Sequence, residues 1–525
     1  MIFVVGSGPA GISCAQGLLA RGADVTLIDS GHSLESSKLV QLESLAKTDS
    51  ASWTKESIKF LKEGMDASSS GILLKLAYGS DFPYREPIGA TPFSCEGADT
   101  KPSYAQGGLS TVWGSAVLPY RQEDLDEWPV TTEDLEEGYR AVLTWMPLAA
   151  RRDDLDSVFP LYCDSYSPMP LSRQAAALLK DLEKHKSQLK NHNVLFGASR
   201  LAVKSALTAD APGCVTCGLC MYGCPHRLIY SSDLTLRALM AHPRFRYRSG
   251  LTVRTVEESA TAVTLDAVDE KGGTVRLEGD RVFLAAGVLG TASILLRSTG
   301  QYDHPITLKD SQYYLLPLLR LKGTAQVSTE RLHTLAQLFL EIFDPSVSPY
   351  TIHLQTYTYN ELFREPVAAK LGPARPFFPL ESFIGRLLLF QGYLHSKHSP
   401  HINLTLQKTA DGDRLTAVGV MNPDTKRTLR KLVKKLVGLV GLTGLMPLIP
   451  MLQPGKPGRG FHSGGTFPMR TNPGSGESDI FGRPSGMRKI HAVDASVFPT
   501  IPATTITFTV MANAYRIGSL LDQYA

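Results

Sequence analysis

The chain of 525 residues has little net charge and few cysteines. Its 54 lysines and arginines nearly balance its 50 aspartates and glutamates, which gives a formal net charge of +4. Nucleic-acid binding needs a concentrated basic face, so no nucleic-acid partner is expected. Seven cysteines in this length do not suggest a disulfide framework. The first residues lack the basic region and cleavage site of a secretory signal, and we expect a cytoplasmic protein.

Long apolar runs are also lacking. The uncharged run of residues 436–452 is shorter than the roughly 20 residues of a membrane-spanning helix, and Pro447 and Pro450 interrupt it. No transmembrane segment is therefore expected. Six lysines and arginines precede this run, between residues 426 and 435. Two interpretations stay open: a buried helix with a solvated basic half, or a peripheral contact with an anionic membrane surface.

The first residues have the pattern of a nucleotide-binding strand, turn and helix. The apolar run Ile2–Val5 predicts a buried parallel strand, and apolar residues at helical spacing follow as far as Leu19. Between them stand Gly6, Gly8 and Gly11. In such a turn the first glycine allows the tight bend, the second lets the backbone approach a pyrophosphate, and the third lets the helix pack on the strand. The amides at the helix start then face the phosphates.

An acidic residue follows at the position that binds the ribose of an adenosine. The strand-like run of residues 25–28 ends on Asp29, 18 residues beyond Gly11. Its carboxylate can accept hydrogen bonds from both ribose hydroxyls and would repel the 2′-phosphate of NADP. The motif therefore predicts FAD or NAD. Pro9 and Ala10, in the glycine turn itself, are expected to contact the same ligand.

Four further stretches follow in order along the chain: residues 107–114, 282–298, 462–466 and 493–502. The first reads Gly-Gly-Leu-Ser-Thr-Val-Trp-Gly and the third reads His-Ser-Gly-Gly-Thr. Together with the glycine turn, they resemble the signatures of the glucose-methanol-choline (GMC) flavoprotein oxidoreductases. The resemblance spans nearly the whole chain and implies FAD as the cofactor.

The resemblance also implies the architecture. We expect an α/β fold, α+β overall, with a Rossmann-like FAD-binding domain and a substrate domain whose antiparallel sheet is flanked by helices. The FAD-binding domain would comprise residues 1–130, 205–305 and 455–525, and the substrate domain residues 131–204 and 306–454. Strand-like runs agree with that sheet at residues 312–321, 350–359, 387–395 and 401–407. Helical spacing at residues 175–189 and 425–440 agrees with the flanking helices.

Further cofactor contacts are implied by the same resemblance. In addition to the glycine turn and Asp29, they are Gly108, Ser110, Val253, Ala286, Gly287, Asp494, Ala495 and Thr505. Relatives with a covalent flavin have a histidine in the loop where this chain has Val112, so the FAD is expected to be non-covalent. Residues 502–505 predict the hydroxyl-capped start of the last helix, whose N-terminus would point at the flavin.

Oxidation of an alcohol by a flavin needs a base for the hydroxyl proton. His462 aligns with the active-site histidine of the family and is the expected base. The usual histidine or asparagine partner is replaced by Thr505, which could still donate one hydrogen bond to the substrate. His395, His398 and His401 are additional candidates, with His395 assigned as a substrate contact, unless this segment is a solvated hairpin.

Four of the seven cysteines fall within eleven residues: Cys214, Cys217, Cys220 and Cys224. This is the ferredoxin spacing, and it resembles the iron–sulfur segment of some membrane-associated GMC dehydrogenases. An iron–sulfur cluster, a zinc ion and plain thiols, as in several GMC alcohol oxidases, all fit it. A cluster would pass electrons from reduced FAD to an acceptor protein.

The expected function is FAD-dependent oxidation of a C–OH group in a sugar, polyol or other alcohol, by hydride transfer to flavin N5. A dehydrogenase is favoured, with a small-molecule substrate and an electron-acceptor protein as partners. Two alternatives remain: a lipid or sterol alcohol oxidase at a membrane surface, and a non-catalytic electron-transfer flavoprotein.

Overall fold

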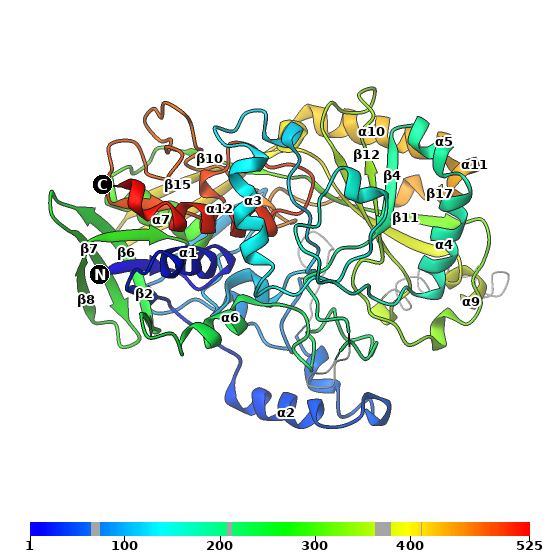
Figure 1. Cartoon of the computed structure of the whole chain (residues 1–525), viewed down its shortest axis with the longest axis horizontal. Helices are drawn as coiled ribbons and strands as arrows, with labels where there is room; N and C mark the ends of the chain where they lie inside the picture. Colours follow the sequence, from blue (N-terminus) through cyan, green and yellow to red (C-terminus); the bar gives the residue numbers. More distant parts are fainter. Residues whose placement is uncertain (65–73, 207–212, 363–379, 411, 525) are drawn as a thin grey trace.

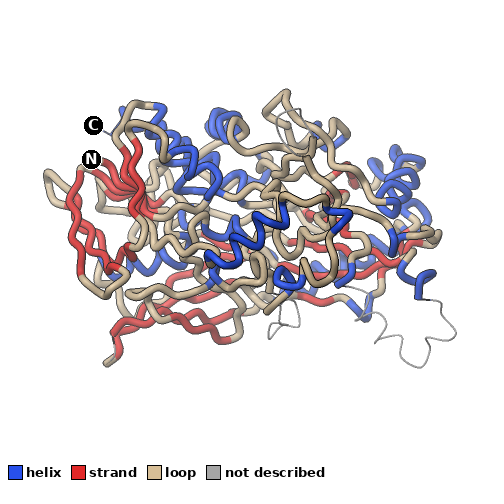
Figure 2. Tube along the Cα trace, turned by 90° about the horizontal axis from the view of Figure 1, so that it is seen from below, coloured by secondary structure: helices blue, strands red, loops and turns tan. Residues whose placement is uncertain are grey.

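The computed structural model describes residues 1–64, 74–206, 213–362, 380–410 and 412–524. A parallel sheet with its helices lies at the end of the molecule that carries both termini, and a large antiparallel sheet lies at the other end (Figure 1). Figure 2 shows the same separation from below, with the two termini again at one end.

The parallel sheet is assembled from distant parts of the chain. The central strand β1 pairs in parallel with β2 on one side and with β9 on the other, and β9 pairs with β20. The strand order is β20 (Ile490–Ala492), β9 (Arg281–Leu284), β1 (Ile2–Val5), β2 (Val25–Ile28) and β5 (Phe245–Arg248). Helix α1 (Pro9–Ala20) packs on α12 (Thr507–Ser519), which packs on α3 (Thr132–Val142). The carboxyl ends of β20, β9, β1 and β2 therefore meet at one edge.

Two further sheets accompany this core. One is a mixed sheet in the order β19 (Ser463–Gly464), β10 (Ile306–Asp310), β15 (His401–Thr409), β16 (Gly412–Val420) and β3 (Phe93–Glu96). The other contains β6 (Leu251–Glu258), β7 (Val263–Asp269) and β8 (Thr274–Gly279). Helix α7 (Gly287–Ser298) follows β9 and contacts β6 and β15.

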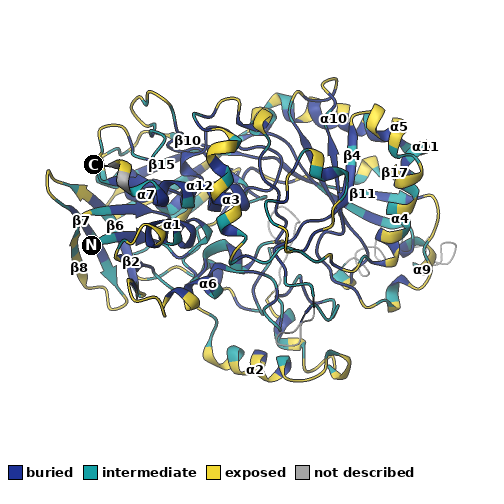
Figure 3. Ribbon diagram, viewed as in Figure 1, coloured by how far each residue is buried: buried dark blue, intermediate teal, exposed yellow. Residues whose placement is uncertain are grey.

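The large antiparallel sheet is the main element of the second half of the molecule. Its order is β17 (Leu445–Pro447), β11 (Tyr313–Arg320), β14 (Leu387–Tyr393), β13 (Ile352–Tyr357), β12 (Leu338–Ile342) and β4 (Val194–Ala198), and β18 (Gln453–Pro454) also pairs with β11. The side chains of one sheet face form a buried core with α4 (Arg173–Lys184), α5 (Lys186–Asn191) and α10 (Pro423–Gly438). Figure 3 shows the buried strands and the exposed outer sides of α10, α5 and the projecting helix α2 (Ser36–Ala46).

Most of the predicted elements are present, with two corrections. The run at 401–407 forms β15, which pairs with β10 and β16 and lies outside the large antiparallel sheet. The predicted hydroxyl cap at residues 502–505 is wrong, because the last helix begins at Thr507 and its cap residue Ile506 makes no side-chain cap bond. Residues 501–505 instead form a buried, non-helical segment with bends at Ala503 and Thr504.

The apolar run at 436–452 belongs to the fold. It covers the end of α10, α11 (Val440–Thr443), β17 and the short helix Ile449–Met451. Leu436 and Leu439 are buried against the antiparallel sheet, whereas the basic residues Lys426, Arg430 and Lys434 are exposed. This arrangement supports the buried helix with a solvated basic side. In the described residues, no helix has the length and apolarity needed to cross a membrane.

The glycine turn after β1 provides a test of this fold. A Cβ atom added at Gly11 would lie 1.9 Å from the carbonyl oxygen of Gly6. Gly11→Ala should therefore destabilise the protein by about 1–3 kcal/mol and lower its content of the expected FAD. Gly441→Ala in α11 is the matched control, because nothing lies within 4 Å of its added Cβ. Thermal unfolding and flavin content check both variants, and a fully stable, flavin-rich Gly11→Ala protein would contradict the close contact.

Candidate functional site

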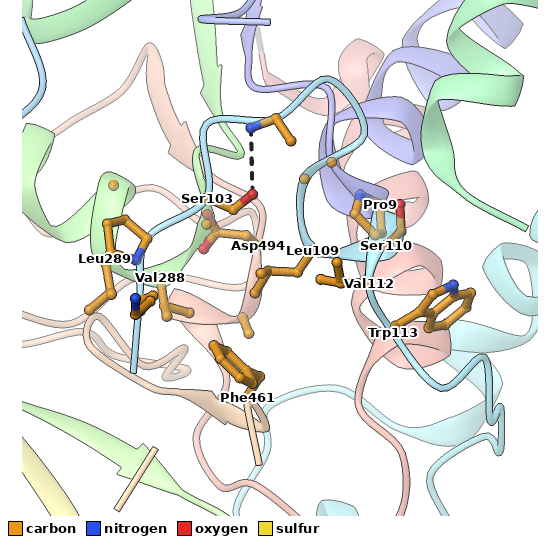
Figure 4. Close-up of a pocket in the computed structure, with 18 of the residues that line it drawn as sticks. Pro9, Ser103, Leu109, Ser110, Val112, Trp113, Val288, Leu289, Phe461 and Asp494 are labelled. Atoms are coloured by element: carbon orange, nitrogen blue, oxygen red, sulfur yellow. Dashed lines mark hydrogen bonds between the residues drawn. The ribbon is translucent and has the colours of Figure 1, made fainter. Parts of the chain in front are cut away.

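A cavity of about 450 Å³ lies where the carboxyl ends of the parallel strands face the antiparallel sheet. The two halves of the fold supply its two ends. In Figure 4, Leu109, Val112 and Trp113 border one side of the cavity, Val288 and Leu289 the other, and Phe461 lies between them. The cavity is thus bordered by the loop at 107–114, the start of α7 and the segment that carries His462.

The glycine turn lines one end of the cavity. Helix α1 begins at Pro9, and its cap residue Gly8 makes no side-chain cap bond, so the first amides of the helix point toward the cavity end without a side chain across them. Ser7 joins the turn to two other segments: its hydroxyl donates to Asp29 and accepts from the Gly107 amide at 2.9 Å. This geometry suits a pyrophosphate.

Asp29 stands at the end of β2, beside the turn. Its carboxylate is 7% exposed and also accepts from the Tyr247 hydroxyl at 3.4 Å. Burial raises the pKa of Asp29 to about 7. A buried carboxylate is stabilised by additional hydrogen-bond donors, which the two hydroxyls of a ribose would supply. The donor set and the glycine cradle therefore fit the adenosine diphosphate part of FAD.

The predicted cofactor residues meet at this cavity, although they come from five separate segments. The residues that line it are Gly6, Gly8, Pro9, Ala10, Asp29, Gly108, Ser110, Val253, Ala286, Gly287, Asp494, Ala495 and Thr505. Gly11 does not line it and acts through its contact with Gly6. Asp494 is held by the Thr291 hydroxyl at 2.6 Å, and burial raises its pKa.

The loop at 107–114 is fixed by hydrogen bonds from both sides. The Ser110 hydroxyl donates to the Gly107 carbonyl at 2.5 Å and accepts from the Ser232 amide at 2.9 Å. The Trp113 indole donates to the Tyr230 carbonyl at 2.7 Å. The loop therefore has a fixed conformation beside the cavity. Val112, which lines the cavity, has no nucleophilic atom that could form a covalent bond to a flavin.

His462 lies at the junction of the two halves of the cavity. Its ring stacks on Tyr393, with centroids 4.4 Å apart and planes 14° apart. Its Nδ1 has no hydrogen-bond partner among the described residues. Burial lowers the pKa of His462 to about 3, so its imidazole is neutral near pH 7. His462 lines the cavity, and a neutral imidazole there can accept a proton.

Asp310 holds the segment that carries His462. Its two carboxylate oxygens accept from the Ser463 hydroxyl and from the Gly458 amide, each at 2.8 Å. The adjacent Ser311 amide donates to the His462 carbonyl at 3.0 Å. Burial raises the pKa of Asp310 to about 7. These bonds fix the backbone on both sides of the imidazole.

Thr505 lines the cavity just before α12. Its hydroxyl oxygen accepts from the Leu118 amide at 2.8 Å, which leaves the hydroxyl proton for another acceptor. Ile506 and Thr507 line the cavity as well, so the first turn of α12 borders it without a side-chain cap. The positive end of this helix can stabilise negative charge there.

The other predicted histidines lie elsewhere. His395 is buried, stacks on Tyr350 at 3.9 Å between centroids, and accepts from the Lys397 amide at 3.1 Å. His398 pairs with the Ser348 hydroxyl at 3.1 Å, and His401 begins β15. None of the three is among the described residues that line the cavity, so the structure does not bring the substrate candidate His395 to it.

Residues that the sequence did not single out complete the cavity. They lie on one face of the antiparallel sheet: Tyr313, Gln355, Tyr357, Gln391 and Tyr393. The signal was the alternation of polar and apolar residues at the start of β13, whereas β14 begins with four apolar residues. It was not sufficient, because alternation identifies a two-sided strand and does not reveal what its polar side faces.

The four cysteines of the predicted cluster pack into two different hydrophobic groups. Cys214, Cys220 and Cys224 contact the group around Leu118 and Leu335, whereas Cys217 contacts the group around Leu42 and Leu61. Within the described ranges, no three or more His, Cys, Asp or Glu side chains form a group that could hold a metal ion. The iron–sulfur cluster predicted from the spacing therefore has no support in the described part of the chain.

Comparison with known proteins identifies a family for the middle segment of the chain. Residues 102–310 match the sequence model of the family described as GMC oxidoreductase. Residues 102–310 of this chain therefore belong to the GMC oxidoreductase family. No curated protein matches it significantly. The GMC family is FAD-dependent, and the match covers the loop at 107–114, Val253 and the start of α7, all of which border the cavity.

Solved structures share the fold over nearly the full length. Pyridoxine 4-oxidase from Mesorbium loti has a TM-score of 0.61 and 16% identity, with 99% of each chain covered. A formate oxidase has a TM-score of 0.62 and 14% identity, covering 99% of this chain and 98% of that chain. A formate oxidase variant from Aspergillus oryzae gives 0.60 and 14%, with the same coverage. At this identity the likeness establishes the fold alone.

The cysteine geometry predicts an iron-free GMC oxidoreductase. Protein purified without oxygen should contain no iron above background and show only flavin absorbance, because the described side chains form no group of three or more that could hold a metal ion. Elemental analysis and visible spectroscopy measure this, and Cys217→Ala provides a comparison with three thiols. Iron in stoichiometric amount that is lost in Cys217→Ala would contradict this prediction and support an iron–sulfur cluster.

Proposed function

We propose that this GMC oxidoreductase oxidises a small, polar alcohol to the corresponding carbonyl compound, with His462 as the base. The single observation that carries this proposal is the neutral imidazole of His462, whose Nδ1 has no partner among the described residues, in a cavity shared with the FAD-binding turn. FAD bound there would supply the acceptor for the hydride from the alcohol carbon. His462 takes the hydroxyl proton, so that both atoms lost by the alcohol are accounted for.

The other residues of the cavity hold the reactants in place. Asp310 and Ser311 fix the backbone beside His462, and the stacked Tyr393 ring keeps the imidazole plane in one orientation. Thr505 keeps a hydroxyl proton that can be donated to the substrate oxygen. The uncapped start of α12 favours negative charge at the same end of the cavity. Val112 supports a non-covalent FAD.

A polar substrate fits the cavity better than a lipid or sterol alcohol. Gln355, Gln391 and three tyrosines line the end beside His462. An apolar ligand would remove their polar atoms from water without replacing those hydrogen bonds. An electron-transfer flavoprotein would have no need of a buried histidine base in this cavity. The prediction of a dehydrogenase with a protein acceptor relied on an iron–sulfur cluster. The described residues provide no metal site, so this prediction has no structural support.

Flavin reduction without oxygen tests the proposal. FAD-loaded enzyme is mixed with sugars, polyols, aromatic alcohols, pyridoxine and formate, and bleaching of the flavin absorbance is recorded. At least one alcohol should bleach the flavin, and His462→Asn should slow that step by about 10²–10⁴-fold with FAD still bound. The control His395→Asn removes a buried imidazole outside the cavity lining and should reduce at the wild-type rate.

Bleaching by none of the alcohols, or an unchanged rate in His462→Asn, would reject the proposed base chemistry. Readmission of air then separates the two types of acceptor. Rapid return of the flavin colour indicates an oxidase, whereas slow return that a redox dye accelerates indicates a dehydrogenase.

The low pKa of His462 predicts the pH profile. The base form is the neutral imidazole, which exists above its pKa of about 3. As the pH falls from about 8 to about 5, this group stays neutral and kcat/KM should not fall on its account. An acid limb centred near ~6.5, the ordinary pKa of histidine, would contradict the buried environment. The profile of His462→Asn identifies limbs that belong to other groups.

A further inference from the structure

The cavity face of the antiparallel sheet carries an ordered row of polar side chains that the proposed reaction does not use. The register places His353 opposite Tyr393 and Tyr393 opposite Tyr313, across the three neighbouring strands β13, β14 and β11. In the next row along the same face, Gln355 is opposite Gln391. Directly opposed residues on one face are close enough to interact, so these side chains form one continuous surface.

A chain of hydrogen bonds runs from this surface into the protein. The Tyr357 hydroxyl donates to Gln355 Oε1 at 3.1 Å, and Gln355 Nε2 lies 3.1 Å from His353 Nε2. His353 Nδ1 lies 2.6 Å from Glu341 Oε1. Both His353 and Glu341 have no exposed surface. The chain therefore begins at the cavity and ends at a fully buried carboxyl group.

The direction of each hydrogen bond follows from its neighbour. The amide nitrogen of Gln355 can only donate, so His353 Nε2 is the acceptor and the ring proton is on Nδ1. That proton is donated to the carboxylate of Glu341. The orientation of the Gln355 amide then directs its oxygen at Tyr357, which must be the donor in the last bond. The buried pair thus fixes the direction in which the Tyr357 hydroxyl donates.

Tyr357 is consequently an acceptor toward the cavity. Its proton is used by Gln355, and its hydroxyl oxygen keeps lone pairs for a ligand. This oxygen lies beside the loop at 107–114, 3.6 Å from the place where a Cβ of Gly114 would be. Tyr393 has the opposite polarity, because its oxygen accepts from Gln391 Nε2 at 2.7 Å and its own proton is not used in that bond.

Aromatic rings enclose the space between these groups. Tyr313 and Tyr393 are in edge contact, with centroids 5.6 Å apart and planes 67° apart, and the His462 ring stacks on Tyr393. Phe461 also lines the cavity. Flat rings of this kind favour a flat, cyclic ligand, which can stack or make edge contacts with them.

We propose that Tyr357 is a specificity residue that accepts a hydrogen bond from a second donor group on a flat ring alcohol. The inference rests on the proposed function, in which His462 takes the proton of the hydroxyl that is oxidised. Glu341, His353 and Gln355 are positioning residues that keep Tyr357 an acceptor. A ring alcohol without a second donor leaves this buried oxygen unpaired and should be used about 10-fold less efficiently.

Paired probes test this assignment. The ratio of kcat/KM for 3- or 4-hydroxybenzyl alcohol to that for benzyl alcohol is measured for the wild-type holoenzyme and for Tyr357→Phe and Glu341→Gln. For at least one hydroxyl position the wild-type ratio should be about 10 or more. It should fall to near one in Tyr357→Phe and should decrease in Glu341→Gln. Tyr314→Phe is the matched control, because Tyr314 is on the opposite face, in the helix-covered core, and should keep the wild-type ratio.

Binding without turnover separates this inference from the proposed function. Benzamide and its 3- and 4-hydroxy derivatives are titrated into the oxidised holoenzyme, and the change in flavin absorbance gives Kd. Tighter binding of a hydroxy derivative, lost in Tyr357→Phe, supports the inference even if no alcohol reduces the flavin. A wild-type preference near one, an unchanged preference in Tyr357→Phe, or no binding and no turnover of any ring compound overturns it.

Discussion

The functional architecture depends on the parallel pairing of four strands that come from three distant parts of the chain. Because β1 pairs with β2 and β9, and β9 with β20, the residues that follow these strands gather at one edge. That edge holds the glycine turn, Asp29, the start of α7 and Asp494. None of these segments could form a nucleotide site alone. The close backbone approach of Gly6 and Gly11 lets α1 start directly behind β1, with its amides at the same edge.

The two principal sheets contribute different chemical groups to the cavity. The parallel sheet offers backbone amides and a carboxylate, which suit a nucleotide, whereas the antiparallel sheet offers aromatic rings and side-chain amides, which suit a small polar substrate. His462 lies between them, on a segment that a third sheet holds through the pairing of β19 with β10 and through Asp310. His462 therefore has a fixed position between the two principal sheets without belonging to either of them.

Local patterns were sufficient to predict what depends on local geometry. Spacing placed the glycine turn and Asp29 together, and a motif that resembles the family's singled out His462, which lines the same cavity. The start of α12 was misplaced because Pro502 and the threonines after it are good cap residues, but in the fold they lie in a buried, bent segment before the helix. Strand β15 was assigned to the wrong sheet, since strand propensity does not identify a partner. Cysteine spacing likewise does not show where the thiols point, and Tyr357 and its network depend on register between strands far apart in sequence.

The central claim is that one cavity brings the flavin of FAD to the junction between the two sheets, beside His462. A crystal structure of the FAD-loaded protein tests it most directly. The account predicts the pyrophosphate at the amides of the glycine turn, the ribose at Asp29, and the flavin ring between the loop at 107–114 and His462, with the substrate-facing side toward Tyr357 and Tyr393. A flavin ring directed away from His462, or an adenosine away from Asp29, would contradict it.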